Sequence, residues 1–295
     1  MHENNDVSLP RLIFTIILNL IITVAQIVGG IISGSLALIS DAIHNLSDTI
    51  SVILAYIAQL LSLKPSTKQS TFGYKRAEIL AAFINAVALI AISVYLIFEA
   101  IERLLEPQPV DARWMFWLGL LGLIANGLSV LVLEREKNKN INIKAAYLHL
   151  LGDALTSLAV IAGAGLIWFF EIVWVDAVVT ILIGVYLLVH TSKLLAESVM
   201  ILMQMAPKTF DGKRVEEQLL KISGIRRVYH IHVWNLTDKI LHFECHIELE
   251  NDFRVSETKD INERIRNILH DEFDIDHVTI QFEYGSQNIS DCDCQ

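Results

Sequence analysis

The chain has 295 residues, of which 53% are hydrophobic and 19% are charged, and its mean hydropathy is +0.48. This apolar content exceeds what one soluble domain of this length buries, so we predict an integral membrane protein. The net charge of −10 is acidic, which argues against a nucleic acid as a partner.

Six apolar stretches occupy the first two thirds of the chain, each with about the ~20 residues that cross the hydrocarbon core of a bilayer. We predict membrane-spanning helices at Leu12–Ile32, Leu36–Leu61, Ile79–Ile101, Trp114–Leu133, Ile143–Trp168 and Val173–Leu195. Basic residues gather in the loops after the second and fourth stretches: Lys64, Lys68, Lys75, Arg76, Arg135, Lys137, Lys139 and Lys144. Because basic loops stay on the cytoplasmic side of a bilayer, both termini are predicted to be cytoplasmic.

The second and fifth stretches each contain a His and an Asp four positions apart, namely His44 with Asp48 and His149 with Asp153. On a helix this spacing puts both side chains on one face, about one turn apart. Two such faces turned toward each other offer two imidazole nitrogens and two carboxylate oxygens, a set that suits tetrahedral zinc. Asp41, one turn before His44, is expected to support this site.

A single pair of this kind in a soluble helix is more simply interpreted as a local helix contact. Inside a membrane, however, an ionisable group costs roughly 2.5–3.5 kcal/mol or more, so such groups are rare away from functional paths. Both pairs repeat with an offset of 105 residues, which indicates two diverged halves of three helices each. Inverted halves place a substrate site near the midplane, where the halves meet.

Other polar residues in the spans have more modest predicted roles. Gln26, Asn85 and Asn126 are interpreted as interhelical hydrogen-bond partners. The lone His190 in the sixth stretch is interpreted as structural or interfacial.

The pattern changes after Met205 to that of a soluble domain, so we divide the chain into residues 1–205 and 206–295. The order of predicted elements is helix 211–222, strand 227–236, strand 240–250, helix 257–271 and strand 277–284. Two helices on one face of a three-stranded sheet make a small α+β domain with the order αββαβ.

Alternation along these strands predicts which residues share a face. Tyr229, Ile231 and Val233 are expected on the buried face of the first strand, whereas His232, His246 and Glu283 are expected on the open face. The open face is either an ordinary polar surface or a metal site, to which His277 also belongs. Cys292 and Cys294 either add soft ligands or form an inert frayed end.

These features together resemble the cation diffusion facilitator family of zinc-type metal/proton antiporters. The resemblance rests on both His-x-x-x-Asp pairs, on the stretch Phe72-Gly73-Tyr74-Lys75-Arg76-Ala77-Glu78, and on His230-Ile231-His232-Val233-Trp234. It implies a six-helix transmembrane domain followed by a cytoplasmic ferredoxin-like domain, in a homodimer.

The resemblance also implies roles for individual residues. His44, Asp48, His149 and Asp153 take the positions of the transport ligands, in a combination associated with zinc. His232, His246 and Glu283 resemble regulatory metal ligands. The loop 64–76 contains no His, so no site is expected there. The loop after the fourth span lacks a His-rich insert, which favours a bacterial plasma membrane.

We therefore expect an exporter of Zn²⁺, and of Cd²⁺ or Co²⁺ as well, that exchanges the metal for protons across the lipid bilayer. Zinc is expected to be both substrate and regulatory ligand. ATP is not expected to drive it, since the chain has no Gly-x-x-x-x-Gly-Lys-Ser/Thr loop. An intramembrane metalloenzyme is disfavoured because four ligands leave zinc no open position for water. A metal sensor that signals through the C-terminal domain is a further alternative.

Overall fold

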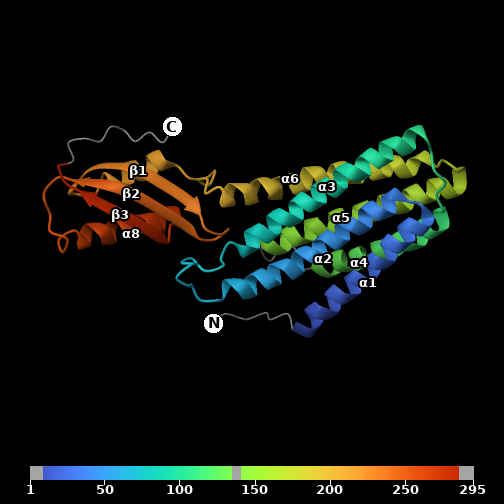
Figure 1. The fold of residues 1–295 in the computed structure, drawn as a ribbon, viewed down its shortest axis with the longest axis horizontal. Coiled ribbons are helices and arrows are strands. Elements are labelled where there is room, and N and C mark those ends of the chain that lie inside the picture. Colours follow the sequence, from blue (N-terminus) through green and yellow to red (C-terminus); the bar gives the residue numbers. More distant parts are fainter. Residues whose placement is uncertain (1–8, 135–140, 286–295) are drawn as a thin grey trace. The chain divides into compact units, whose positions relative to one another are not determined.

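The computed structural model describes residues 9–134 and 141–285, and six long helices run side by side in its first part (Figure 1). Their bounds are α1 Leu9–Ser33, α2 Leu36–Ser62, α3 Ala77–Leu105, α4 Ala112–Glu134, α5 Ile141–Phe170 and α6 Trp174–Leu202. The predicted spans match these helices to within a few residues, except that α6 continues past Leu195 to Leu202.

Five of the described helices, α2 to α6, are long and apolar enough to cross a membrane. The described side chains of α1 include a shorter apolar part, Asn19–Ser33. Large apolar side chains on the outside of the bundle are exposed, as Phe169 is to 79%, which is expected where lipid rather than water covers the surface. The chain is a multi-pass membrane protein.

The hairpin between α1 and α2 is held by residues from other helices. Gly34 at its tip has φ +72°, and a Cβ there would lie 2.9 Å from the Pro109 carbonyl oxygen. The buried carboxylate of Asp176, in the first turn of α6, accepts hydrogen bonds from the Ser35 hydroxyl at 2.5 Å and from the Leu36 amide at 2.8 Å. Because a carboxylate suits the positive end of a helix, this contact fixes the start of α2 against α6.

The chain divides into two compact units, of which the second joins Ala58–Leu80 to everything from Ala196 onward. This second unit contains a small αββαβ domain, as predicted (Figure 1). Its elements are α7 Gly212–Leu219, β1 Ile225–Asn235, β2 Leu241–Leu249, α8 Lys259–Phe273 and β3 His277–Glu283. The sheet order is β1-β2-β3; β1 and β2 pair antiparallel, and α8 connects the parallel pair β2 and β3.

Both helices of this domain cover the same face of the sheet. Leu219 of α7 and Ile265 of α8 pack with Phe243 and Ile247 of β2, and all four are at most 1% exposed. Cys245 lies in the same core, where burial raises the pKa of its thiol to about 12. A thiol that stays protonated at neutral pH is a poor metal ligand, so Cys245 is a core residue.

A β-bulge in β1 corrects the predicted alternation. Tyr229 pairs with His246, yet His232 pairs with Glu244, so β1 has one residue more than β2 between these points. The extra residue shifts the phase of the strand. The buried valines are Val228 and Val233, and the prediction that Tyr229 belongs to the buried face was wrong.

Candidate metal centre

The two predicted His–Asp pairs meet between α2 and α5. His44 Nε2 lies 2.9 Å from Asp153 Oδ1 and 3.7 Å from Asp48 Oδ2. His149 Nε2 lies 3.5 Å from Asp48 Oδ2 and 3.8 Å from Asp153 Oδ2. Neighbouring ligand atoms of a tetrahedral zinc ion are about 3.3 Å apart. One of these four separations is shorter than the separation expected around a single tetrahedral zinc ion, and the other three are slightly longer.

The four side chains differ in their burial. The His44 and Asp153 side chains are 3% and 5% exposed, whereas those of Asp48 and His149 are 36% and 37% exposed. The two rings meet edge to face, with centroids 6.1 Å apart. One side of the cluster is thus closed by protein, and the other side is open to a metal ion.

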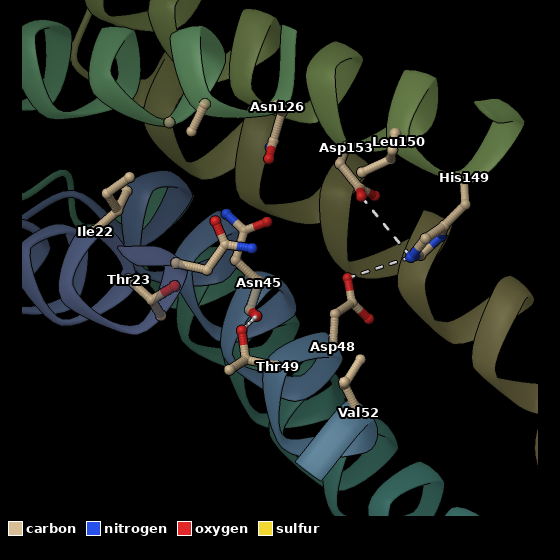
Figure 2. Close-up of a pocket in the computed structure, with 13 residues that line it drawn as sticks. Ile22, Thr23, Asn45, Asp48, Thr49, Val52, Asn126, His149, Leu150 and Asp153 are labelled. Carbon is tan, nitrogen blue, oxygen red and sulfur yellow. Dashed lines mark hydrogen bonds and ion pairs between the residues drawn. The ribbon is translucent and has the colours of Figure 1, made fainter. Parts of the chain in front are cut away.

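The open side faces a cavity of about 250 Å³. Figure 2 shows Asp48, His149 and Asp153 turned toward one another at its edge, with Asn45, Thr49 and Asn126 among the other lining residues. The lining residues of α2, Asn45 to Val52, lie around the middle of that helix, and those of α5 lie in its first half. The first half of α5 follows one of the two basic loops.

Asp41 lies beside this cluster but makes its contacts elsewhere. Its carboxyl contacts the hydroxyls of Thr156 and Ser157 on α5, and Gln26 Nε2 of α1 at 3.4 Å. The predicted interhelical roles of Gln26, Asn85 and Asn126 are confirmed. Asn85 Nδ2 donates to the Ser47 and Ser51 hydroxyls of α2, and Asn126 Nδ2 of α4 donates to the Ser157 hydroxyl.

His190 is a neighbour of the cluster that the sequence reasoning did not assign to it. Its ring stacks on that of His149, with centroids 6.0 Å apart and an interplanar angle of 17°. The ring of Tyr186 also stacks on that of His190, with centroids 6.2 Å apart. The sequence did carry one signal of a functional role for His190, because an ionisable group is costly in an apolar membrane-spanning stretch. The sequence alone does not show which face of α6 meets α5.

A second group of His and acidic residues lies on the open face of the C-terminal sheet. His246 Nδ1 is 3.0 Å from Glu283 Oε1, and His232 Nε2 is 3.1 Å from His230 Nε2. The rings of His230 and His246 are 4.8 Å apart. His230, with φ +52° at the bulge, therefore joins His232, His246 and Glu283 in what we call the sheet cluster.

Glu283 is held as a carboxylate by its neighbours. The Tyr229 hydroxyl donates to its Oε2, and Gln281 Nε2 donates to its Oε1 at 2.7 Å. These hydrogen bonds, together with the nearby His246, lower the pKa of Glu283. At neutral pH its oxygens are therefore available to a metal ion.

His277, a further predicted tail ligand, is not brought to this cluster. The ring of His277 packs on His242 at 4.3 Å, and these two residues pair four positions along the strands from the pair His246 and Gln281. Four residues of a strand span about 13 Å, so His277 is remote from Glu283. Cys292 and Cys294 lie outside the described residues.

A membrane helix bundle with two imidazoles and two carboxylates at a cavity defines a carrier of divalent metal. The family model described as "Cation efflux transmembrane domain" matches residues 12–203, and the one described as "Cation efflux protein, cytoplasmic domain" matches residues 207–284. The chain therefore belongs to the cation diffusion facilitator family of cation efflux proteins. It is a transporter and not an enzyme.

Curated relatives cover nearly the full chain. The metal cation efflux system protein CzcD of Cupriavidus metallidurans is 39% identical over 88% of this chain and 82% of its own length. The cadmium, cobalt and zinc/H(+)-K(+) antiporter of Bacillus subtilis is 37% identical over 90% and 86%. The zinc transporter ZitB of Escherichia coli is 36% identical over 99% and 92%.

Proposed function

We propose that this protein exports Zn²⁺ from the cytoplasm in exchange for protons, and that His44, Asp48, His149 and Asp153 are the ligands that carry the metal. The observation that carries this proposal is the meeting of both His–Asp pairs at one point between α2 and α5. Two nitrogens and two oxygens at this spacing suit zinc, and they also admit related borderline metals.

Charge balance supports proton exchange. Zn²⁺ with two carboxylates and two neutral imidazoles is neutral as a group, so the loaded site is tolerable in the bilayer. After the metal leaves, the same atoms regain neutrality by taking up protons. Zinc and protons then compete for one set of atoms, and this competition is the exchange.

The site is loaded from the cytoplasm in the conformation described here. The cavity is lined by the middle of α2 and by the first half of α5, and the loops after α2 and before α5 are the basic ones. By the positive-inside rule those loops, and both termini, are cytoplasmic. The three relatives named above are bacterial, which supports a bacterial plasma membrane as the location.

Relatives also support the proposed metal range. One is named for zinc, and another for cadmium, cobalt and zinc with protons and potassium. We assign Zn²⁺ as the principal substrate and Cd²⁺ and Co²⁺ as further ones, because the imidazole and carboxylate donors of the site do not exclude either ion.

The C-terminal domain, residues 206–295, is assigned to regulation and dimerisation, and residues 1–205 to transport. His230, His232, His246 and Glu283 fit a zinc ion by the chemistry of their donors. Zinc that binds one domain arrangement better than another shifts the equilibrium between them. In this scheme a second copy of the chain is the partner, and zinc on the sheet cluster strengthens the pairing.

The test is metal uptake into proteoliposomes that contain the full chain, with a pH gradient imposed across the bilayer and Zn²⁺, Cd²⁺, Co²⁺, Mn²⁺ and Mg²⁺ in competition. We expect zinc to accumulate on the acidic side of the bilayer, and we expect this accumulation to stop when the pH gradient is collapsed. Uptake that is indifferent to the gradient, or that favours Mg²⁺, contradicts the proposal.

A further inference from the structure

Asp41 is a buried carboxyl group of the membrane domain whose hydrogen-bond partners among the described residues are Gln26, Thr156 and Ser157, with no Lys or Arg. It is 0% exposed, it lies one turn before His44, and it does not line the cavity at the metal centre. The ranges 12–33, 36–62, 114–133 and 147–170 contain no Lys or Arg. An unpaired carboxylate in such surroundings costs several kcal/mol or more.

The two hydrogen-bond contacts of the Thr156 hydroxyl indicate how this cost is avoided. Its hydroxyl oxygen lies 2.8 Å from the Asp153 carbonyl oxygen and 2.9 Å from Asp41 Oδ1. A hydroxyl has one proton to donate, and a carbonyl oxygen is an acceptor without a proton. If the Thr156 hydroxyl donates to the carbonyl, the contact with Asp41 needs its own proton, which a protonated Asp41 supplies.

The other groups around Asp41 are weak donors. The Ser157 hydroxyl lies 3.1 Å from Oδ2 and 3.3 Å from Oδ1, and Gln26 Nε2 lies 3.4 Å from Oδ2. Asp176, the other Asp buried near the start of α2, accepts instead from one hydroxyl and two backbone amides at a helix start, at 2.5 to 3.2 Å. Asp176 is therefore built as a carboxylate, and Asp41 is not.

We propose that Asp41 holds a proton between its Oδ1 and Thr156 Oγ1, and keeps it while the metal centre loads and unloads. The ionisable groups that face it are His44 on its own helix and Asp153 on α5. From α1 the neutral Gln26 contacts it, and Asn126 of α4 contacts Ser157 instead. The Asp41 carboxyl is 2.9 to 3.4 Å from its neighbours. This spacing leaves no room for a larger cation, so the positive charge that fits there is a proton.

This proposal rests on the proposed function and adds a positioning residue to it. The protonated carboxyl holds Thr156, whose hydroxyl binds the backbone of Asp153 one turn earlier. Because Asp41 is neutral, a metal ion at the centre meets the charge of Asp48 and Asp153 alone. The proton on Asp41 is enclosed, and it is distinct from the protons exchanged for zinc.

The test uses Asp41→Asn, because a carboxamide has the shape of a protonated carboxyl and donates N–H to Thr156 Oγ1. We expect Asp41→Ala, which leaves Thr156 without this partner, to weaken zinc binding, and Asp41→Asn to restore the affinity and the ratio of protons to zinc in proteoliposomes to within about twofold of the wild type, as for the exchange of one neutral hydrogen bond for another. A Ser157→Ala variant, which removes a weaker contact, is the matched control. Loss of zinc binding in Asp41→Asn but not in Ser157→Ala overturns the proposal.

Infrared spectroscopy of the full-length protein supplies a readout independent of transport. The carbonyl stretch of a protonated aspartic acid, identified by isotope labelling, is expected in both the zinc-free and the zinc-loaded wild type. In the zinc-loaded protein it should vanish in Asp41→Asn and persist in Asp176→Asn. Its absence from the wild type overturns the proposal even if Asp41→Asn does not fold. Wild-type zinc flux without proton flux contradicts the proposed function instead, and leaves the infrared test of Asp41 standing.

Discussion

The metal centre of the membrane domain and the sheet cluster of the C-terminal domain are made of the same residue types in different surroundings. In the metal centre the side chains of His44 and Asp153 are 3% and 5% exposed and those of Asp48 and His149 are 36% and 37% exposed, whereas in the sheet cluster those of His246 and Glu283 are 29% and 21% exposed. The donors are alike, but in the metal centre the pair His44 and Asp153 is closed off from water.

This difference determines how much each ligand contributes. At the buried pair His44 and Asp153, a charge that loses its partner has no solvent to replace it. On the sheet, the Tyr229 hydroxyl and the Gln281 amide already share Glu283 with His246, and water reaches the cluster. We therefore expect large effects of substitution at the first site and graded effects at the second.

The largest effect is expected for Asp153→Ala. It removes one of four ligands and leaves His44 buried without its 2.9 Å partner. Zinc transport should fall by more than about 100-fold, above the range for loss of a group that merely orients a ligand. The measurement is zinc flux in proteoliposomes, with Asp252→Ala, an exposed carboxyl in a loop of the C-terminal domain, as the matched control. Zinc flux at the wild-type rate in Asp153→Ala would contradict the assignment of the metal centre as the transport site.

His44→Asp should change the choice of metal rather than abolish transport. A third carboxylate in place of an imidazole makes the site harder and more negative. The transport rate of cadmium or manganese relative to that of zinc should therefore rise by about tenfold. Competition between these ions in the same flux assay measures the ratio. An unchanged profile means that residue 44 does not set the selectivity.

A graded effect is expected when His232 and His246 are both replaced by Ala. Zinc should then no longer stabilise the dimer, an effect of about 2.7 kcal/mol at a zinc concentration of 100 times Kd, while transport persists at a reduced rate. Thermal unfolding of the full chain with and without zinc measures the loss. His270→Ala, an exposed His paired with Asp271, is the control, and equal zinc stabilisation in the double variant and the control refutes the role of the sheet cluster.

The smallest effect is expected for Glu283→Gln. The folded pKa of Glu283 lies below its ordinary value of 4.5, so its contribution to stability is complete above that value and is lost as pH falls through the lower folded pKa. The variant should be less stable than the wild type at pH 7 by under about 1 kcal/mol, since solvent screens the site. The two melting curves should converge in acid, and a difference that grows in acid reverses the assigned sign.

Local spacing accounts for what the sequence predicted well. A separation of four residues places His44 with Asp48, and His149 with Asp153, on one helix face without knowledge of the rest of the fold. The shared offset between the pairs then indicated that α2 and α5 form the site. The αββαβ order followed from alternation and helix periodicity in the same local way.

Contacts that depend on how elements pack were beyond the sequence. His190 meets His149 because of the rotation of α6 about its axis, and no local pattern reports that rotation. Tyr229 was placed on the wrong face because one extra residue in β1 shifts the phase of the strand. Alternation placed His230 on the open face but did not single it out as a ligand, and at this bulge its ring lies against those of His232 and His246.

The central claim, that zinc and protons compete for the same four ligands, is tested most directly by zinc binding to the membrane centre as a function of pH. The protein for this titration is the variant with His232 and His246 both replaced by Ala, so that the sheet cluster does not contribute. Calorimetry in two buffers of different ionisation enthalpy gives both the affinity and the protons released. We predict that the affinity falls as pH drops from about 7.5 to about 6, across the ordinary His pKa of roughly 6.5, and that binding releases protons. An affinity that is constant over this range, with no proton release, would contradict the account.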